Sequence, residues 1–324
     1  MKKALIFDCD NTLWKGVVGE DSIIPDETME SNIMFLANRG VIIGICSKNN
    51  EEDIMPILKE RLLDRYISVK RINWKDKASN LKEIAQELNI GLDAIVFVDD
   101  SPFEINLVCK KLPEVMAIHP NNLMTTVINS FDLTGDFTKT QQYKDNYKRA
   151  KAQEQFTDIN DYLASLDMVL TIKVNEEAHI PRIAELTQKT NQFNLTALRY
   201  TEETIKDFMK YGHVYTLSVK DTYGDNGLVG VCIVMGGVID TFLLSCRILG
   251  REIEYAFMDK VFEDYREMQS QDIDMWGIYN PTSKNEQVAD FYSKLGFNLA
   301  ENKNVFIINI KDYKPQAKNH FRYE

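Results

Sequence analysis

Three short, nearly continuous apolar runs stand near the start of the chain, and each one ends at polar side chains. They cover residues 4–9, 41–46 and 94–98 and are rich in branched residues. Such runs are typical of parallel strands covered on both faces. Between them, residues 27–40 and 79–91 place apolar side chains three and four apart and end on glycine, as helices often do. This alternation predicts a doubly wound α/β sheet that binds its ligand at the carboxyl ends of the strands.

A second domain is expected after the first. The chain has 324 residues, 44% of them hydrophobic, which is enough for two domains of ordinary size. Apolar density falls after residue 135, and longer strands then follow at 213–221 and 227–246, before a helix at 250–268. This pattern predicts an antiparallel α+β domain. The expected divisions are an α/β domain at 1–135, a polar helical linker at 136–159 and an α+β domain at 160–324.

Charge and composition exclude several classes of protein. A net charge of −11 argues against nucleic-acid binding, which needs a basic surface. The sequence shows no run of about 18 apolar residues and no signal-peptide core, so we expect a cytoplasmic protein with no membrane partner. Five scattered cysteines offer no disulfide framework and no zinc-binding spacing. They are Cys9, Cys46, Cys109, Cys232 and Cys246.

The stretch DCDNT places two carboxylates, Asp8 and Asp10, directly after the first apolar run. A buried, unpaired carboxylate costs several kcal/mol, so a pair of them predicts a positive partner. Mg²⁺ is the natural candidate because it takes one or two carboxylates together with waters and phosphate oxygens.

Further polar residues follow the other strands at the same predicted edge of the sheet. Ser47 ends the second run, Lys77 begins the next helix, and Asp99 and Asp100 follow the third run. A metal, an ammonium group and a hydroxyl around an attacking carboxylate are the parts of a phosphoryl-transfer site. We therefore expect a phosphorylated small molecule as substrate.

These residues resemble the haloacid dehalogenase superfamily over about the first 130 positions. Its four motifs match DCDNT, CSKN, the lysine of NWKDK and VDDSP in order. The resemblance implies that Asp8 is the nucleophile, Asp10 the general acid and base, and Lys77 a catalytic phosphate grip, with Lys75 as the competing choice. It further implies a phosphate-facing set and a metal-facing set. The first is Thr12, Ser47, Lys48 and Asn49, and the second is Asp8, Asp10, Asp100 and, less directly, Asp99.

The second half resembles the GNAT acyltransferase fold. The stretch at 280–297 is similar to its closing helix and strand, which implies that Asn285 and Tyr292 face a cofactor or substrate. In the stretch SCRILGRE, Arg247 and Gly250 match its pyrophosphate loop, but Glu252 departs from the pattern. A carboxylate at that position opposes the pyrophosphate of coenzyme A.

Taken together, the two halves resemble the FkbH-like family. The resemblance implies loading of a three-carbon acid from 1,3-bisphosphoglycerate onto an acyl carrier protein, with loss of phosphate. Cys246 would then be the acyl-accepting thiol, and Arg247 beside it would bind substrate. A structural strand-end cysteine is the alternative for Cys246. The alternative for the chain is a plain Mg²⁺-dependent phosphatase of a small phosphometabolite or phosphosugar, whose GNAT-like domain acts as a cap or binding module.

A basic stretch at 59–82 suggests where a carrier protein would dock. It holds eight lysines and arginines against three acids, a local charge of +5. Acyl carrier proteins are acidic, so complementary charge would steer one to this stretch. The alternative is a solvated helix face.

Overall fold

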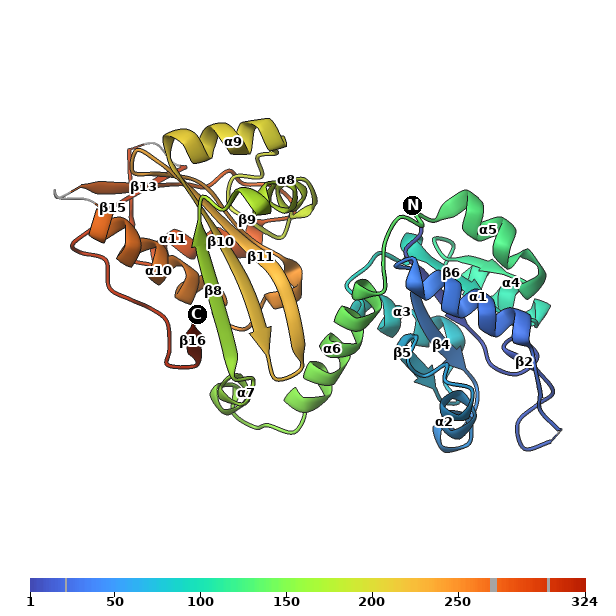
Figure 1. Cartoon of the computed structure of the whole chain (residues 1–324). Coiled ribbons are helices and arrows are strands. Elements are labelled where there is room, and N and C mark those ends of the chain that lie inside the picture. Colours follow the sequence, from blue (N-terminus) through green and yellow to red (C-terminus); the bar gives the residue numbers. More distant parts are fainter. Residues whose placement is uncertain (21, 269–272, 302–303) are drawn as a thin grey trace. The chain divides into compact units, whose positions relative to one another are not determined.

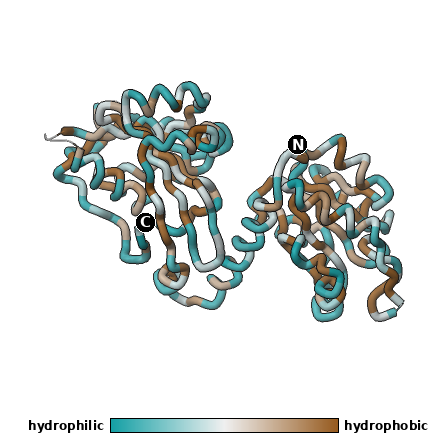
Figure 2. Tube along the Cα trace, in the orientation of Figure 1, coloured by the Kyte–Doolittle hydropathy of each residue, from teal (hydrophilic) through white to brown (hydrophobic). Residues whose placement is uncertain are grey.

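The computed structural model describes every residue except 21, 269–272 and 302–303. The chain divides into two compact units, Met1–Ala152 and Gln153–Glu324 (Figure 1). The hydrophobic colour of Figure 2 is concentrated in the strands of both units. None of the helices in the described part of the chain combines the length and the apolar character that crossing a bilayer requires.

The first unit is built around five parallel strands, which confirms the predicted doubly wound sheet. Their order across the sheet is β5 (Ile67–Ile72), β4 (Ile42–Ser47), β1 (Ala4–Phe7), β6 (Ile95–Val98) and β7 (Met116–Ile118). All four pairings are parallel, and β1 is the central strand. The loops that follow β1, β4, β5 and β6 therefore lie at one edge of the sheet.

Two apolar cores cover the two faces of this sheet. One core contains residues of α1 (Glu27–Asn38), α2 (Glu51–Glu60) and α5 (Leu123–Ser130), and the other contains residues of α3 (Lys77–Glu87) and α4 (Pro102–Lys111). Successive side chains of β1 alternate between them, because Leu5 and Phe7 belong to the first core and Ala4 and Ile6 to the second. A rigid three-layer scaffold thus supports the loops.

Two smaller elements complete the first unit. A short hairpin, β2 (Trp14–Lys15) with β3 (Ile24–Pro25), is the insertion after the first motif. The polar segment expected at 136–159 contains α6 (Thr138–Gln153), which is largely teal in Figure 2. Lys144 of α6 donates to the carbonyls of Asp64 and Arg65, so the helix is tied to the turn before β5.

The second unit is an α+β structure, as predicted, although its sheet is mixed rather than antiparallel. Its main path runs β14 (Asn298–Leu299), β15 (Val305–Asn309), β13 (Asp274–Ile278), β12 (Val238–Leu244), β11 (Gly224–Met235), β10 (His213–Asp221), β8 (Met168–Val174) and β16 (Phe321–Tyr323). The run expected at 227–246 folds as the β11–β12 hairpin. Gly236 and Gly237 make its turn, both with positive φ, as a tight two-residue turn requires.

Helices cover both faces of this second sheet. Residues of α8 (Ile180–Lys189) and α9 (Glu202–Tyr211) form a core with Leu243 of β12. The neighbouring residue, Phe242, instead packs its ring against Phe257 of α10 (Ile253–Met268) and Phe291 of α11 (Phe291–Lys294). The remaining elements are α7 (Ile159–Ser165) and β9 (Phe193–Asn194), which pairs with β12 outside the main path.

Candidate active site

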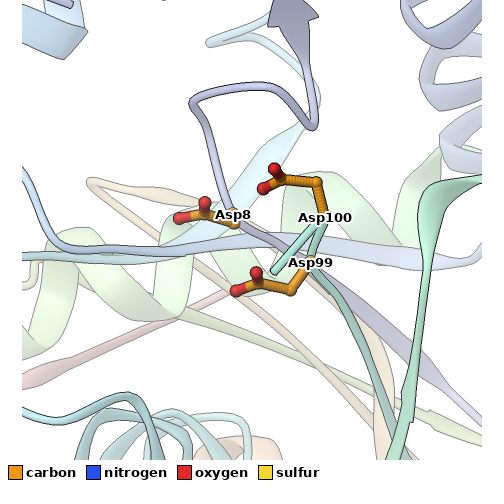
Figure 3. A group of neighbouring side chains, drawn as sticks. All are labelled: Asp8, Asp99 and Asp100. Carbon is orange, nitrogen blue, oxygen red and sulfur yellow. The ribbon is translucent and has the colours of Figure 1, made fainter. Parts of the chain in front are cut away.

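Three carboxylates meet where the loops after β1 and β6 come together. Asp8 directly follows β1, and its N–H donates to the carbonyl of Val98, the last residue of β6. Asp99 and Asp100 follow β6. Figure 3 shows the carboxylates of Asp8, Asp99 and Asp100 gathered on one side of these loops, and one oxygen from each lies within 4.8 Å of the others. Asp8 is 8% exposed and Asp99 is fully buried. Burial, with Lys77 opposing it, raises the pKa of both carboxyls above their ordinary values.

One buried lysine bridges this cluster. Lys77 Nζ lies 2.5 Å from Asp99 Oδ2 and 3.0 Å from Asp8 Oδ1. It is the first residue of α3, and Asp76 before it caps that helix by accepting the N–H of Ser79. Burial by itself lowers the pKa of Lys77, but the two carboxylates outweigh it and hold that pKa above its ordinary value. The ammonium group is therefore charged at neutral pH and is fixed beside Asp8.

The two adjacent aspartates of the β6 loop differ in how far the protein already uses them. Asp99 accepts Lys77 on one oxygen and the N–H of Ser101, 2.8 Å away, on the other. Among the side chains of the described residues, only the hydroxyl of Thr12 donates a hydrogen bond to the Asp100 carboxylate, at 3.4 Å. Burial and then the charge of Asp8 raise the pKa of Asp100. Asp100 is thus the more available oxygen donor.

This cluster fits a divalent cation by the chemistry of its donors. Three carboxylates share one ammonium group, so negative charge is in excess in a largely buried place. Hard oxygen ligands of this kind suit Mg²⁺, with waters and phosphate oxygens filling the remaining positions. Asp8 and Asp100 are the side chains that would hold it.

Asp10 lies outside the three-carboxylate group. One of its oxygens accepts the indole N–H of Trp14 and the backbone N–H of Val18, both at 3.1 Å, and the other accepts the amide of Asn49 at 2.9 Å. These bonds tie Asp10 to the β2–β3 hairpin and to the loop after β4. Its carboxylate is therefore oriented by protein donors, which suits an acid and base better than a metal ligand.

The end of β4 and the loop that follows it bring Ser47 and Asn49 to the cluster. The amide of Asn49 also donates to Ser47 Oγ at 3.2 Å, and a hydrogen bond from Ser47 opposes the rise in the pKa of Asp8. Thr12 accepts the N–H of Asp100 at 3.1 Å and so joins the first loop to the fourth. The structure thus brings together the four sequence motifs at one edge of the sheet.

Lys48 has a partner that sequence reasoning missed. Its Nζ lies 2.6 Å from Oε1 of Glu104, whose side chain is mostly buried. The other oxygen, Glu104 Oε2, is buried with no hydrogen-bond partner among the described residues. Glu104 stands in the first turn of α4, where an acid ordinarily indicates only a favourable helix start. In the sequence, the one feature that could have indicated Glu104 as a site residue is its position four residues after Asp100.

Cys246 and Arg247 belong to the second unit. Cys246 is exposed in the short turn that follows β12. Arg247 Nε donates to Ser245 Oγ at 3.2 Å. Arg251 is 7% exposed, pairs with Asp221 at 3.0 Å and also donates to the carbonyl of Arg247. Arg251 is therefore committed to the fold rather than to the thiol.

Comparisons with known proteins give partial matches. No protein-family model matches the chain, and no curated protein matches it. Over 41% of its length the chain is 35% identical to the N-terminal part of the protein BF1531 from Bacteroides fragilis, which contains a phosphatase domain complexed with Mg (TM-score 0.37). The match spans only 41% of that crystallised N-terminal part.

Two other solved structures resemble parts of the chain more distantly. A HAD-superfamily hydrolase from Geobacter sulfurreducens is 16% identical over 39% of this chain and 99% of its own, with a TM-score of 0.32. The ribosomal-protein-S18-alanine N-acetyltransferase from Escherichia coli is 12% identical over 46% and 97%, with a TM-score of 0.33. The chain is thus similar in parts to phosphatase-type and acetyltransferase-type structures.

Proposed function

We propose that the first unit is a Mg²⁺-dependent phosphoryl-transfer enzyme that acts on a phosphorylated small molecule. The observation that carries this proposal is the Lys77 ammonium group, fixed between Asp8 and Asp99 within a group of three carboxylates. A purely structural ion pair needs one carboxylate for one lysine. The excess of negative charge and its position at the carboxyl ends of the strands support a cation and a phosphate ligand. The Mg in the similar phosphatase domain of BF1531 agrees with this choice.

In the proposed reaction, Asp8 attacks the phosphorus of a phosphomonoester. A bond forms between an Asp8 carboxylate oxygen and phosphorus, the bond from phosphorus to the leaving oxygen breaks, and Asp10 gives that oxygen a proton. Water then attacks the aspartyl-phosphate, gives its proton back to Asp10 and releases inorganic phosphate. Bound Mg²⁺ would neutralise phosphate charge in both steps.

The other residues of the site position and neutralise the phosphate. Lys77 supplies a fixed positive charge beside the attacking oxygen, and the Ser47 hydroxyl at the end of β4 supplies a hydrogen-bond donor that the Asn49 amide orients. Thr12 holds the nucleophile's loop against Asp100. Lys48 is held by Glu104 at the same loop and is proposed to contact the substrate's phosphate or its neighbouring group.

The specific reaction we propose is the FkbH type. The thiolate of Cys246 attacks the acyl carbon of 1,3-bisphosphoglycerate, and the bond from that carbon to the phosphate oxygen breaks. The thiol of an acyl carrier protein then attacks this thioester, takes the 3-phosphoglyceryl group and releases the Cys246 thiolate. Hydrolysis of the remaining phosphomonoester at Asp8 releases inorganic phosphate and leaves the glyceryl group on the carrier. The exposure of Cys246 supports its role, and Arg247 beside it would bind the phosphate.

A plain phosphatase is the second candidate. The short β2–β3 hairpin is the insertion after the first motif, so the first unit carries little of its own to cover the site. A small phosphometabolite or phosphosugar could then be hydrolysed directly, with the second unit serving as a cap or binding module.

Two assays separate these candidates. Hydrolysis of p-nitrophenyl phosphate that requires Mg²⁺ and stops with EDTA tests the shared chemistry. A carrier protein incubated with the chain, Mg²⁺ and 1,3-bisphosphoglycerate should gain the mass of a glyceryl group, and Cys246→Ser should lose this transfer but keep the hydrolysis. Hydrolysis without any carrier modification would leave the plain phosphatase as the function. Activity that persists in EDTA would contradict both candidates.

A further inference from the structure

The second unit contains a place where two neighbouring parallel strands part. β12 and β13 pair only through Val238 with Trp276 and Ile239 with Gly277. Further along β12, its opposite edge remains paired with β11 as far as Leu244. The edge of β12 that faced β13 is therefore left without that partner, and we call this place the wedge. An open strand edge of this kind is where an extended, amide-bearing ligand arm can bind.

We infer that the wedge is sealed by the chain itself, and that the second unit does not bind coenzyme A although its acetyltransferase-like fold implies that cofactor. β9 pairs antiparallel with the free edge of β12, through Asn194 with Leu243 and Phe193 with Leu244. The N–H of Leu195 continues the ladder by donating to the carbonyl of Phe242 at 3.1 Å. The backbone of β12 from Phe242 to Leu244 is therefore already paired on the edge that an amide-bearing arm would use.

The β13 side of the wedge is closed by the same segment. The N–H of Asn280, two residues after β13, donates to the carbonyl of Leu195 at 2.8 Å. The Asn280 amide donates to the carbonyl of Thr196 at 3.2 Å. One short segment therefore bridges both parting strands, so it fills the wedge rather than lining one wall.

Asn285 locks this segment in place. The side chain is fully buried, and its amide donates to the carbonyls of Asn194 at 2.9 Å and Asn280 at 3.0 Å. Its oxygen accepts the N–H and the hydroxyl of Thr282, at 2.7 and 3.0 Å. The expectation that Asn285 faces a cofactor is therefore wrong, since every hydrogen-bonding group of its side chain serves the fold.

The expectation for Tyr292 is wrong for a related reason. Its side chain is 1% exposed, and the ring lies directly against Gly277 of β13, where an added Cβ would come within 2.5 Å of ring atoms. Aromatic rings of Phe297 and Phe306 pack beside it. Tyr292 thus fills the core next to the wedge and has no face open to a ligand.

The second requirement of coenzyme A, a site for its pyrophosphate, is blocked as well. The N-terminus of α10 follows the loop that resembles a pyrophosphate loop, and a helix N-terminus favours anions. Here Glu252 and Glu254 place carboxylates at that position, and Lys318 of the C-terminal segment pairs with Glu252 at 2.8 Å. The chain's own acids thus take the place of a bound anion.

This inference agrees with the donor in the glyceryl transfer proposed above, a step that rests on the proposed function. If coenzyme A has no site, acyl groups must arrive in another activated form. An acyl phosphate such as 1,3-bisphosphoglycerate carries its own leaving group and needs no coenzyme. The sealed wedge therefore fits an acyl phosphate donor.

The test is a titration of the full chain with coenzyme A and acetyl-coenzyme A by isothermal calorimetry. We expect no saturable heat up to about 1 mM ligand, the concentration that corresponds to only about −4 kcal/mol of binding free energy. Saturable binding by the wild-type chain would overturn the inference. No phosphatase assay is involved, so a failed proposed function leaves this result interpretable.

Hydrogen exchange reads the seal directly. The amides of Leu195 and Asn280 should exchange as slowly as those of the central strands. Their exchange rates should not change when acetyl-coenzyme A is added. Rapid exchange at both amides, or loss of their protection on adding the ligand, would show a wedge that opens and would contradict the seal.

A variant separates the two barriers. Glu252 has a φ of +58°, so Glu252→Gly suits the backbone while removing the carboxylate. Because β9 still fills the wedge, this variant should bind no more coenzyme A than the wild-type chain. Binding by Glu252→Gly would show that the filled wedge is no barrier and would overturn the inference.

Discussion

Polar side chains near the strand ends are only partly paired in the first unit and are fully hydrogen-bonded in the second. In the first, three carboxylates gather around a single ammonium group, and Asp100 has one long side-chain hydrogen bond among the described contacts. In the second, the amide of Asn285 has a protein partner for every donor and acceptor. An uncompensated excess of negative charge indicates a ligand site, whereas a fully satisfied hydrogen-bond network indicates a structural role. Chemistry is therefore expected from the first unit's polar edge and rigidity from the second unit's wedge.

The largest expected effect comes from removing the proposed nucleophile. Asp8→Asn keeps the side-chain volume but removes the attacking carboxylate, so hydrolysis of p-nitrophenyl phosphate should fall at least about 1000-fold. The change also removes one of three crowded negative charges, so the thermal midpoint without Mg²⁺ should stay the same or rise.

A matched control is Asp93→Asn, an exposed aspartate of the same unit, which should keep wild-type turnover. Undiminished turnover in Asp8→Asn would place the nucleophile elsewhere and would remove the contrast between the two units.

Lys77→Met tests whether the first cluster depends on its single cation. Without the ammonium group, Asp8 and Asp99 lose their only described counter-charge, and breaking a buried ion pair typically costs about 3–5 kcal/mol of unfolding free energy. Urea unfolding in EDTA should show that loss, and adding Mg²⁺ should recover part of it.

Lys75→Met is the control for this change. Lys75 pairs with Glu83, but its side chain is 64% exposed, so the loss should stay below about 1 kcal/mol. A similar loss of unfolding free energy in both variants would mean that the buried ion pairs of Lys77 contribute no more to stability than the exposed pair of Lys75.

Asn285→Ala tests the opposite half of the comparison. It leaves the buried carbonyls of Asn194 and Asn280 and the N–H of Thr282 without their partner. We expect the second unit to lose about 3 kcal/mol, since each unsatisfied buried group costs roughly 1–3 kcal/mol and local relaxation recovers some of it. Hydrolysis of p-nitrophenyl phosphate should be unchanged.

The control here is Asn309→Ala, which removes two solvent-accessible hydrogen bonds, one to Asp274 and one from the N–H of Lys311, and should cost about 1 kcal/mol or less. Equal stability of the two variants, by calorimetry of the full chain, would show that Asn285 is no lock.

The sequence alone predicts the sheet and the four loops of the first unit because local patterns carry both. The runs at 41–46 and 94–98 become β4 and β6 within one residue, and their polar ends meet at one edge. Parallel pairing forces that meeting, so no long-range information is needed. The same reasoning explains why Lys77, at the start of a helix, reaches Asp8.

Other features depend on contacts that no local pattern shows. Asp10 is drawn away from the cluster by Trp14, Val18 and Asn49, and β9 is a two-residue strand too short for any periodicity. Asn285 resembles a cofactor-facing residue until its partner Asn194, 91 positions away, is known. The identity of a ligand-facing residue therefore needs the tertiary structure.

The basic stretch at 59–82 carries less net charge in the structure than in the sequence, for the same reason. Five of its eight cations pair with acids from outside the stretch, so the local charge of +5 does not exist as a surface. The pairs are Arg61 with Glu30, Lys70 with Glu51, Arg71 with Glu83 and Glu87, Lys75 with Glu83, and Lys77 with Asp8 and Asp99. A count along the sequence cannot include acids that folding brings in from other elements.

The smallest expected effect concerns carrier docking, because of this neutralisation. Lys59, Arg65 and Lys82 are the exposed cations of the stretch for which no ion pair is described, so they are what remains to steer an acidic carrier.

Reversing Lys59 and Arg65 to Glu should slow the proposed glyceryl transfer by only about threefold at low salt, with little effect at high salt, since exposed charges are screened over roughly 10 Å at 0.1 M. Hydrolysis of p-nitrophenyl phosphate should not change, because no hydrogen bond or ion pair is described between either residue and the Asp8 cluster. Reversing Lys70 instead would break its 2.6 Å pair with Glu51, so any loss there would report folding as well as docking. A tenfold or larger, salt-sensitive loss of transfer in the Lys59 and Arg65 variant would show that the first unit carries a docking surface as well as the chemistry.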